Sequence, residues 1–248
     1  AADTLIYLGD DSLLREMNRQ RIAHVVTFGL GSTPNLTASN ILEKGLAGSE
    51  FDAEGFGRVT LAIPGRHNVL NALAALAVSR TLGVPPGDAV AALARVRPFS
   101  GRMEVRRFGA ITVIDDSYNA NPDSMRAALD LLRETPHAGR RVAVLGEMLE
   151  LGQATVPMHR EVGAAASFVD RLFLIGPSAG EVAKAAQGAG LAPDRIREFP
   201  HLDILLATVP GALQDGDLVL VKGSRGMALD RLVSAIESRA GHPAGGGR

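Results

Sequence analysis

The chain has 248 residues with 26 basic and 27 acidic side chains, which give a formal net charge of −1. Since a domain typically has roughly 100–200 residues, this length allows one large domain or two modest ones. The composition, with 46% hydrophobic and 21% charged residues, argues against a disordered chain. A near-neutral chain has no general electrostatic attraction to nucleic acid. The longest apolar stretch is about ten residues long, whereas a membrane-spanning helix needs ~20. We therefore expect no nucleic-acid partner and no membrane insertion. The absence of cysteine excludes disulfides and thiolate metal sites.

The first 97 residues alternate between strand-like and helical patterns. They predict strands at 4–8, 24–28 and 58–63, and helices near 13–17, at 68–82 and at 88–96. Residues 29–57 are rich in Gly, Ser, Thr and Asn and predict loops with short strands. No secretory leader precedes the first strand, which favours a cytoplasmic protein. Proline and glycine at 97–101 interrupt two apolar-periodic regions and predict a domain boundary there.

After that boundary the pattern is more regular. It predicts strands at 103–107, 111–115, 141–145, 171–175, 195–199 and 217–221, and helices at 122–134, 158–168, 179–189, 202–209 and 227–238. Strands that alternate with helices indicate an α/β fold with a doubly wound parallel sheet. We expect two domains, 1–97 and 98–239, followed by a flexible tail at 240–248.

Polar residues that follow strands are the first candidates for a ligand site, because ligands of open α/β sheets bind beyond the carboxyl ends of the strands. The segment 115–124 (DDSYNANPDS) begins with Asp115 and Asp116 and adds a phenol at Tyr118 and amides at Asn119 and Asn121. The alternative interpretation is an Asx-rich loop in which Asn121 or Ser117 caps the next helix.

Two further clusters suggest contacts with a nucleotide. Asn68 and Asn71 are three residues apart and share one face of a helix, where their amides can read an adenine edge; a simple helix cap is the alternative. Arg102 follows Gly101, so its planar guanidinium can approach a phosphate, although an ordinary surface arginine fits the same pattern.

The remaining clusters lie near the ends of later strands. Lys222, Ser224 and Arg225 suggest a grip on a phosphate or carboxylate, with a basic turn as the alternative. Glu147 follows the strand at 141–145, where it could act on a ligand or be solvated, and His159 on a helix is more typical of a structural role.

Taken in order, these clusters resemble the Mur ligases of peptidoglycan synthesis, and most of all the MurF branch. The motifs are GRHNVLNALAA at 65–75, SGRME at 100–104, DDSYNANPDS at 115–124, LGEMLELG at 145–152 and KGSR at 222–225. The resemblance runs from about residue 4 to 238 but covers only the later half of the family's enzyme.

That resemblance implies a fold and an activity. Residues 1–97 would be the rear part of the central ATPase domain, and 98–239 the Rossmann-like C-terminal domain that binds the amino-acid or dipeptide substrate. The implied reaction adds D-alanyl-D-alanine to UDP-N-acetylmuramoyl-tripeptide with ATP, through an acyl phosphate that the dipeptide amine attacks. Such catalysis is mostly positioning and charge neutralisation.

The resemblance also implies site residues. Asn68 and Asn71 would lie beside adenine, Arg102 would contact ATP phosphate as the catalytic cation, and Asp116 would hold the ribose. The dipeptide side would comprise Tyr118, Asn119, Asn121, Lys222, Ser224 and Arg225. The Mg²⁺ ligands would lie outside this chain.

One departure from the family bears on activity. A phosphate-cradling loop needs lysine followed by Ser or Thr, but Lys44, Lys184 and Lys222 are followed by Gly, Ala and Gly. We therefore expect the chain alone not to turn over ATP. A ligase similar to folylpolyglutamate synthase and a binding module without catalysis are the alternatives.

Overall fold

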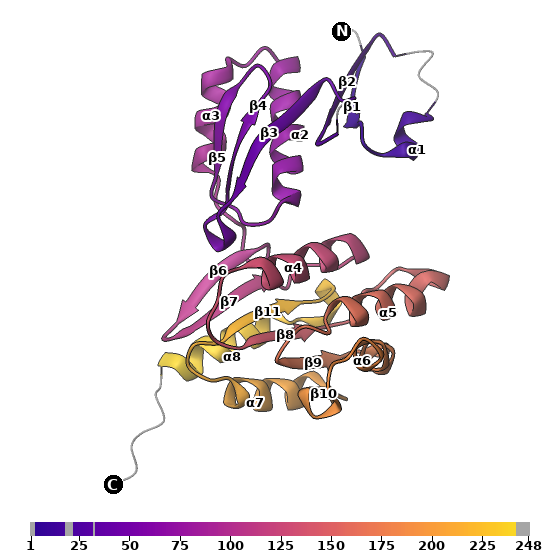
Figure 1. The fold of residues 1–248 in the computed structure, drawn as a ribbon, viewed down its shortest axis with the longest axis vertical. Coiled ribbons are helices and arrows are strands. Elements are labelled where there is room, and N and C mark those ends of the chain that lie inside the picture. The colour runs from indigo at the N-terminus through magenta and orange to yellow at the C-terminus, as the bar shows by residue number, and fades with distance from the viewer. Residues whose placement is uncertain (1–2, 18–21, 32, 242–248) are drawn as a thin grey trace. The chain divides into compact units, whose positions relative to one another are not determined.

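The computed structural model describes residues 3–17, 22–31 and 33–241, and it divides into two compact units, 1–97 and 98–248 (Figure 1). Most of the expected tail at 240–248 lies outside the described residues, since the last helix ends at Gly241. No helix in the described ranges is long and apolar enough to cross a membrane.

The first unit is built on a five-stranded sheet in the order β1-β2-β3-β4-β5. Strands β1 (Thr4–Leu8), β2 (His24–Gly29) and β3 (Leu36–Glu43) are parallel, whereas β4 (Ser49–Ala53) and β5 (Gly57–Leu61) continue the sheet as antiparallel neighbours. The expectation of short strands in 29–57 was thus wrong for β3, which has eight residues. A register shift between Ser39 and Leu42 breaks its alternation, which is why the pattern was not visible in the sequence.

The helices of this unit are α1 (Ser12–Arg15), α2 (His67–Thr81) and α3 (Pro86–Arg95). Helix α2 buries Val69, Leu73 and Leu76 at helical spacing, and they join a core with Leu36 and Phe51 of the sheet. This packing fixes the helix whose first two turns carry the two asparagines.

The second unit contains a six-stranded sheet in the order β10-β9-β8-β11-β7-β6. The strands are β6 (Glu104–Phe108), β7 (Ile111–Asp116), β8 (Arg141–Leu145), β9 (Arg171–Ile175), β10 (Ile196–Phe199) and β11 (Leu218–Lys222). All neighbours are parallel except β6 and β7, which pair antiparallel. The expectation of a wholly parallel sheet was wrong at this edge, because only Gly109 and Ala110 separate the two strands and so short a turn joins antiparallel strands.

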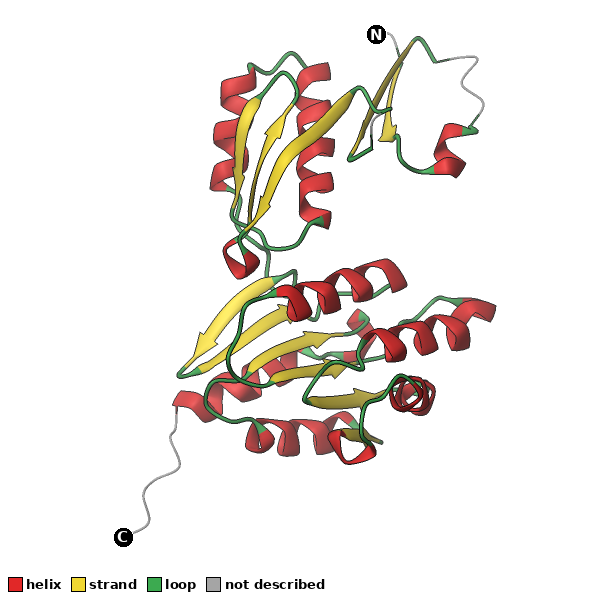
Figure 2. Ribbon diagram, viewed as in Figure 1, coloured by secondary structure: helices red, strands yellow, loops and turns green. Residues whose placement is uncertain are grey.

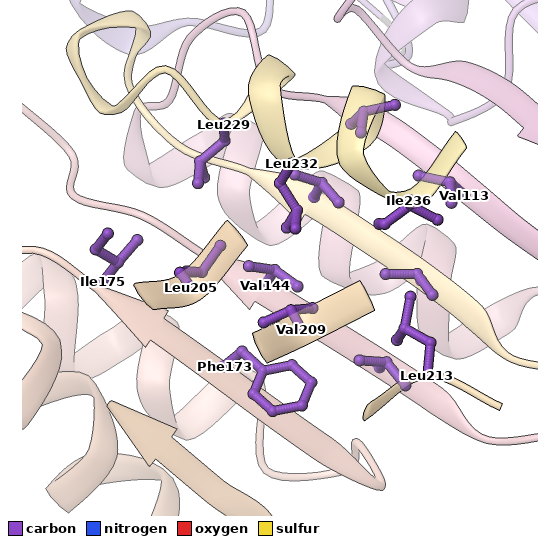
Figure 3. Packing of buried hydrophobic residues seen from close by; sticks show 14 of the residues in the cluster. Val113, Val144, Phe173, Ile175, Leu205, Val209, Leu213, Leu229, Leu232 and Ile236 are labelled. Atoms are coloured by element: carbon purple, nitrogen blue, oxygen red, sulfur yellow. The ribbon is translucent and has the colours of Figure 1, made fainter. Parts of the chain in front are cut away.

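Helices cover both faces of this sheet, as expected of a doubly wound fold (Figure 2). They are α4 (Pro122–Glu134), α5 (Thr155–Ala165), α6 (Ala179–Gly188), α7 (Leu202–Ala212) and α8 (Asp230–Gly241). Short 3₁₀ turns occupy Gly45–Ala47, Gly152–Ala154, Pro193–Arg195 and Arg225–Met227. Figure 3 shows α7 and α8 side chains such as Leu205 and Leu232 packed against Val113 and Val144 of the sheet.

The strand order determines which loops meet. Strand β11 lies between β7 and β8, with Lys222 in register with Asp116 on one side and Leu145 on the other. The loops that follow β7, β8 and β11 therefore emerge together at the carboxyl edge of the sheet, the place where α/β sheets bind ligands.

Candidate functional site

A buried ion pair lies at the centre of this edge. The Lys222 ammonium is 2.5 Å from a carboxylate oxygen of Asp116 and donates a 2.9 Å hydrogen bond to the Asn119 carbonyl. Lys222 is only 1% exposed. The other Asp116 oxygen accepts the Met103 N–H at 3.0 Å. The pair thus joins the end of β11, the loop after β7 and the segment before β6, and each charge is compensated where water is excluded.

The loop before β6 approaches the loop after β7 closely at Gly101. This glycine has φ +72°, its carbonyl accepts the Tyr118 N–H at 2.9 Å, and an added Cβ would lie 3.2 Å from both the Ser117 hydroxyl and the Tyr118 nitrogen. A side chain is therefore unfavourable both for its backbone angle and for the space available. The contact holds the next residue, Arg102, beside the Tyr118 ring.

Two guanidinium groups lie against that ring. The carbon of the Arg102 guanidinium is 4.0 Å from the Tyr118 ring centroid, and that of Arg225 is 4.9 Å away, both within the range of cation–π attraction. Both arginines are exposed, and no carboxylate among the described residues lies within ion-pair distance of either. Their charges are available to an anionic ligand.

Ser224 ties the loop after β11 to its neighbours. Its N–H donates to the Glu147 carbonyl at 2.9 Å, and its hydroxyl accepts the Leu149 N–H at 2.9 Å. The side chain is 3% exposed. The Ser224 hydroxyl therefore already has a partner within the fold. The sequence did not predict that this residue bridges the loops after β11 and β8.

Glu147 and His159 form a buried polar network behind these loops. The Glu147 carboxylate accepts the N–H and hydroxyl of Ser178, at 2.9 and 2.6 Å, where helix α6 begins. His159 Nε2 accepts the Met148 N–H at 3.0 Å, while Nδ1 donates to the Thr155 carbonyl at 2.7 Å, an arrangement of the neutral imidazole. Glu147 is 6% and His159 2% exposed, so Glu147 is not solvated and His159 has the structural role that was expected.

Three further polar residues, at the end of β7 and in the loop after it, differ in role. Asn121 caps α4, with its side-chain oxygen accepting the Ser124 N–H at 2.8 Å, so the capping alternative is confirmed. Asp115 accepts hydrogen bonds from the N–H and hydroxyl of Ser117. Burial raises the pKa of Asp115, and these hydrogen bonds only partly offset the effect. Asn119 is exposed.

The two asparagines of the first unit lie on one helical face, as expected. Asn68 donates through its amide to the Pro64 carbonyl at 2.7 Å, and its oxygen accepts the Asn71 amide at 3.0 Å. Both polar atoms of the Asn68 side chain are thus bonded within the fold. Asn71 is exposed, and its side-chain oxygen has no partner among the described residues. Of the two, Asn71 offers a donor and an acceptor to a base.

Sequence reasoning assigned no role to Asp10, which the structure places at the ends of β1 and β2. Its carboxylate accepts the Leu30 N–H at 2.6 Å and the Gly31 N–H at 3.2 Å. A Cβ at Gly29 or Gly31 would lie 2.5 Å from this carboxylate. The two glycines were the signal that could have revealed so close an approach.

An open cavity of about 500 Å³ lies beside the loop that carries Arg225. Its walls come from the ends of β9 and β10 and from the 3₁₀ turn, and include Ile175, Pro177, His201 and Met227. The carboxyl edge of this sheet thus presents two exposed cations next to a partly apolar hollow.

Comparison with protein families gives two successive matches. Residues 101–225 match the model described as "Mur ligase, glutamate ligase domain", and residues 1–79 match "Mur ligase middle domain". The first match alone covers half of the chain.

Curated relatives and solved structures agree with these matches. The chain is 34% identical to UDP-N-acetylmuramoyl-tripeptide–D-alanyl-D-alanine ligase of Bacillus subtilis over 94% of this chain and 50% of that protein. The ligase of the same name from Treponema pallidum is 38% identical, over 91% of this chain and 48% of that protein. The chain therefore spans about half the length of the curated relatives it matches.

Among solved structures, MurF from Acinetobacter baumannii superposes with a TM-score of 0.79 at 28% identity, over 96% of this chain and 52% of the other. A Thermotoga maritima MurF in complex with ADP superposes with a TM-score of 0.80 at 23% identity, over 98% of this chain and 55% of the other. At that identity the likeness shows the fold alone.

Proposed function

Because the chain belongs to the Mur ligase family, we propose that it supplies nucleotide-binding and acceptor-binding parts of an ATP-dependent ligase. The proposed reaction joins D-alanyl-D-alanine to UDP-N-acetylmuramoyl-tripeptide. Support comes from relatives of that name, which are 34–38% identical to more than nine-tenths of this chain. The proposed compartment is the cytoplasm.

The proposed nucleotide roles are those that the family resemblance implies, and the donors and acceptors that the fold leaves available support them. We assign the adenine edge to Asn71, held by Asn68, and a phosphate to the exposed guanidinium of Arg102. Asp116 is assigned to the ribose. Its oxygens each accept one bond from the fold, and a carboxylate has further lone pairs for ribose hydroxyls. ATP would supply the phosphoryl group that activates the tripeptide carboxylate.

The acceptor dipeptide is assigned to the loops at 117–121 and 223–227. Tyr118, Asn119 and Arg225 are the exposed members that could contact it. Lys222 and Ser224 are buried, and we propose that they act by fixing the shape of these two loops. Asn121 would contribute in the same way, through its helix cap.

These residues do three things in the proposed reaction. Arg102 neutralises charge on the phosphate, the rigid loop after β7 orients the dipeptide amine, and the buried Asp116–Lys222 pair keeps the two in a fixed relation within the unit. Positioning and charge neutralisation are the main contributions a protein makes to phosphoryl transfer.

The described residues do not fit a magnesium site. No group of three or more His, Asp or Glu side chains in those ranges could hold a metal ion. We propose that the Mg²⁺ ligands lie outside this chain, and we assign no step to the metal.

One observation carries the proposal, namely the exposed Arg102 guanidinium at the carboxyl edge, which has no carboxylate partner among the described residues and lies in the same unit as the buried Asp116–Lys222 pair. Equilibrium dialysis of the chain with labelled D-alanyl-D-alanine tests it. We expect saturable binding that unlabelled dipeptide displaces and that L-glutamate at equal concentration does not. Preferential displacement by glutamate would instead favour a ligase similar to folylpolyglutamate synthase.

A second assay separates an enzyme from a binding module. The chain alone is expected to release no ADP from ATP. Joined to the matching half of the Bacillus subtilis relative, it is expected to release ADP only when both the tripeptide substrate and the dipeptide are present. A folded chimera that binds both ligands without releasing ADP would favour a module that performs no chemistry.

A further inference from the structure

The contact between one tyrosine and two arginines is more than the assignment of each residue to a ligand requires. We propose that Arg102 and Arg225 act as one phosphate-binding pair, and that the Tyr118 ring is the positioning residue that holds them together. This inference rests on the proposed function, in which Arg102 contacts ATP phosphate. It gives Arg225 a second task beyond the dipeptide, and it gives Tyr118 a task that does not depend on its hydroxyl group.

The three residues come from three separate loops, each fixed by backbone contacts. The Arg102 loop is held by the hydrogen bond from the Tyr118 N–H to the Gly101 carbonyl, at 2.9 Å. The Arg225 loop is held by the buried Ser224, whose carbonyl accepts the Met227 N–H at 2.8 Å. The Arg102 loop is thus bonded to the Tyr118 backbone, and the Arg225 loop is closed by its own turn. Both guanidinium groups reach the ring, at 4.0 and 4.9 Å from its centroid.

The charge balance of this surface favours an anion. Two cations that share one ring repel each other, and the nearby Asp116 charge is already compensated by Lys222. Some exposed arginines of this unit, such as Arg126 and Arg160, have carboxylate partners, whereas neither arginine at Tyr118 has one among the described residues. An anion that contacts both guanidinium groups would remove the repulsion.

The number of donors points to a phosphate. Each guanidinium carries five N–H donors in a planar fork, and both of these guanidinium groups belong to exposed residues. A phosphate has three or more oxygens, enough to accept hydrogen bonds from two guanidinium groups. The two oxygens of a carboxylate match the paired donors of a single guanidinium group. The carboxylate of the dipeptide is the other source of an oxyanion here, and the experiment separates the two.

The chain contains its own reporter. It has two tyrosines and no tryptophan. In a Tyr7→Phe background, which leaves the folded chain with Tyr118 alone, tyrosine fluorescence reports on this ring. We expect titration with inorganic pyrophosphate to change the fluorescence saturably, as the guanidinium groups shift against the ring.

Calorimetric titration with pyrophosphate then tests the pair. Arg102→Gln and Arg225→Gln are each expected to weaken binding by about tenfold or more, the usual effect of losing a charged hydrogen-bonding partner. The double variant should be little worse than either single one, because the two act on one anion. Arg197→Gln is the matched control, since Arg197 also stacks on a ring, at 5.0 Å from the Phe199 centroid, but on β10. The proposal is overturned if Arg225→Gln binds like wild type, or if Arg197→Gln loses as much.

Variants of the ring test the positioning role. Tyr118→Phe retains the aromatic face and is expected to retain pyrophosphate affinity, while Tyr118→Leu should lose about as much as either arginine variant. Far-UV circular dichroism checks that both are folded. Loss of affinity in Tyr118→Phe, or none in Tyr118→Leu, would contradict the proposal.

A parallel titration with D-alanyl-D-alanine keeps the two proposals distinguishable. If pyrophosphate binds in the predicted variant-dependent way and the dipeptide does not bind at all, the acceptor assignment fails and the phosphate pair stands. If the dipeptide binds and only its affinity depends on both arginines, the pair serves a carboxylate and this inference is wrong.

Discussion

Replacing Lys222 by methionine should destabilise the unit 98–248 strongly. The substitution keeps the length and most of the volume of the side chain but removes the cation that pairs with the buried Asp116 carboxylate. It also removes the hydrogen bond to the Asn119 carbonyl. The carboxylate would retain one hydrogen bond, from the Met103 N–H, and lose its compensating charge.

The expected magnitude follows from burial. The Lys222 and Asp116 side chains are 2% and 12% exposed, so water cannot replace the missing ammonium. Breaking such a pair costs about 3–5 kcal/mol. For a unit of this size that free energy corresponds to a fall in melting temperature of about 6–20 °C.

Thermal unfolding followed by far-UV circular dichroism measures the change, and hydrogen exchange of the β7 and β11 amides assigns it to this unit. The double variant Lys222→Met with Asp116→Asn should recover about 2–3 kcal/mol of the loss, because no uncompensated charge remains. Lys184→Met is the matched control: that side chain is 76% exposed in its ion pair, and we expect no measurable change. A loss below about 1 kcal/mol in Lys222→Met, or a double variant less stable than both single ones, would refute the reasoning.

Two further predictions concern the same edge of the sheet. Gly176→Ala should lower the free energy of unfolding, measured in urea, by more than Gly190→Ala does. Both glycines have positive φ, but of the two only Gly176 has a neighbour that an added Cβ would meet, a Glu147 carboxylate oxygen at 2.7 Å. Equal losses of stability in the two variants would contradict this reasoning. Because burial raises the pKa of Asp115, the protonated carboxyl is favoured in the folded chain. The stability that this group contributes is therefore fully present below the ordinary aspartate pKa, near 4, and is lost as the pH rises through the pKa of the folded state. Asp115→Asn removes that dependence, so its stability relative to wild type should improve between about pH 4 and pH 7; a constant difference would show that burial does not perturb this carboxyl.

The regular part of the fold could be predicted because its patterns are local. The core strands β8 and β9 were located to the residue, since each is a short apolar run bounded by turns. Two helix starts were less accurate. Helix α5 begins at Thr155, three residues before the expected start, whereas α8 begins at Asp230, three residues after an expected start that lies in the 3₁₀ turn Arg225–Met227. Apolar periodicity does not separate a 3₁₀ turn from the first turn of an α-helix.

The site shows where sequence reasoning ends. Residue types and their position after strands indicated which loops matter, because the carboxyl edge of an α/β sheet is fixed by topology. The partners were not predictable: that Lys222 is buried against Asp116, or that Arg102 and Arg225 meet on one ring, depends on contacts between residues more than 100 positions apart. Whether the candidate residues contact substrate stays a prediction.

The most direct test of the central claim is an amide chemical-shift map of the ¹⁵N-labelled chain titrated with D-alanyl-D-alanine. The account predicts saturable shifts concentrated in residues 117–121 and 223–227, with little change at β6, α7 or α8 away from the carboxyl edge. Shifts confined to other parts of the chain, or a spectrum unchanged at saturating dipeptide, would contradict the assignment of this edge as the acceptor site.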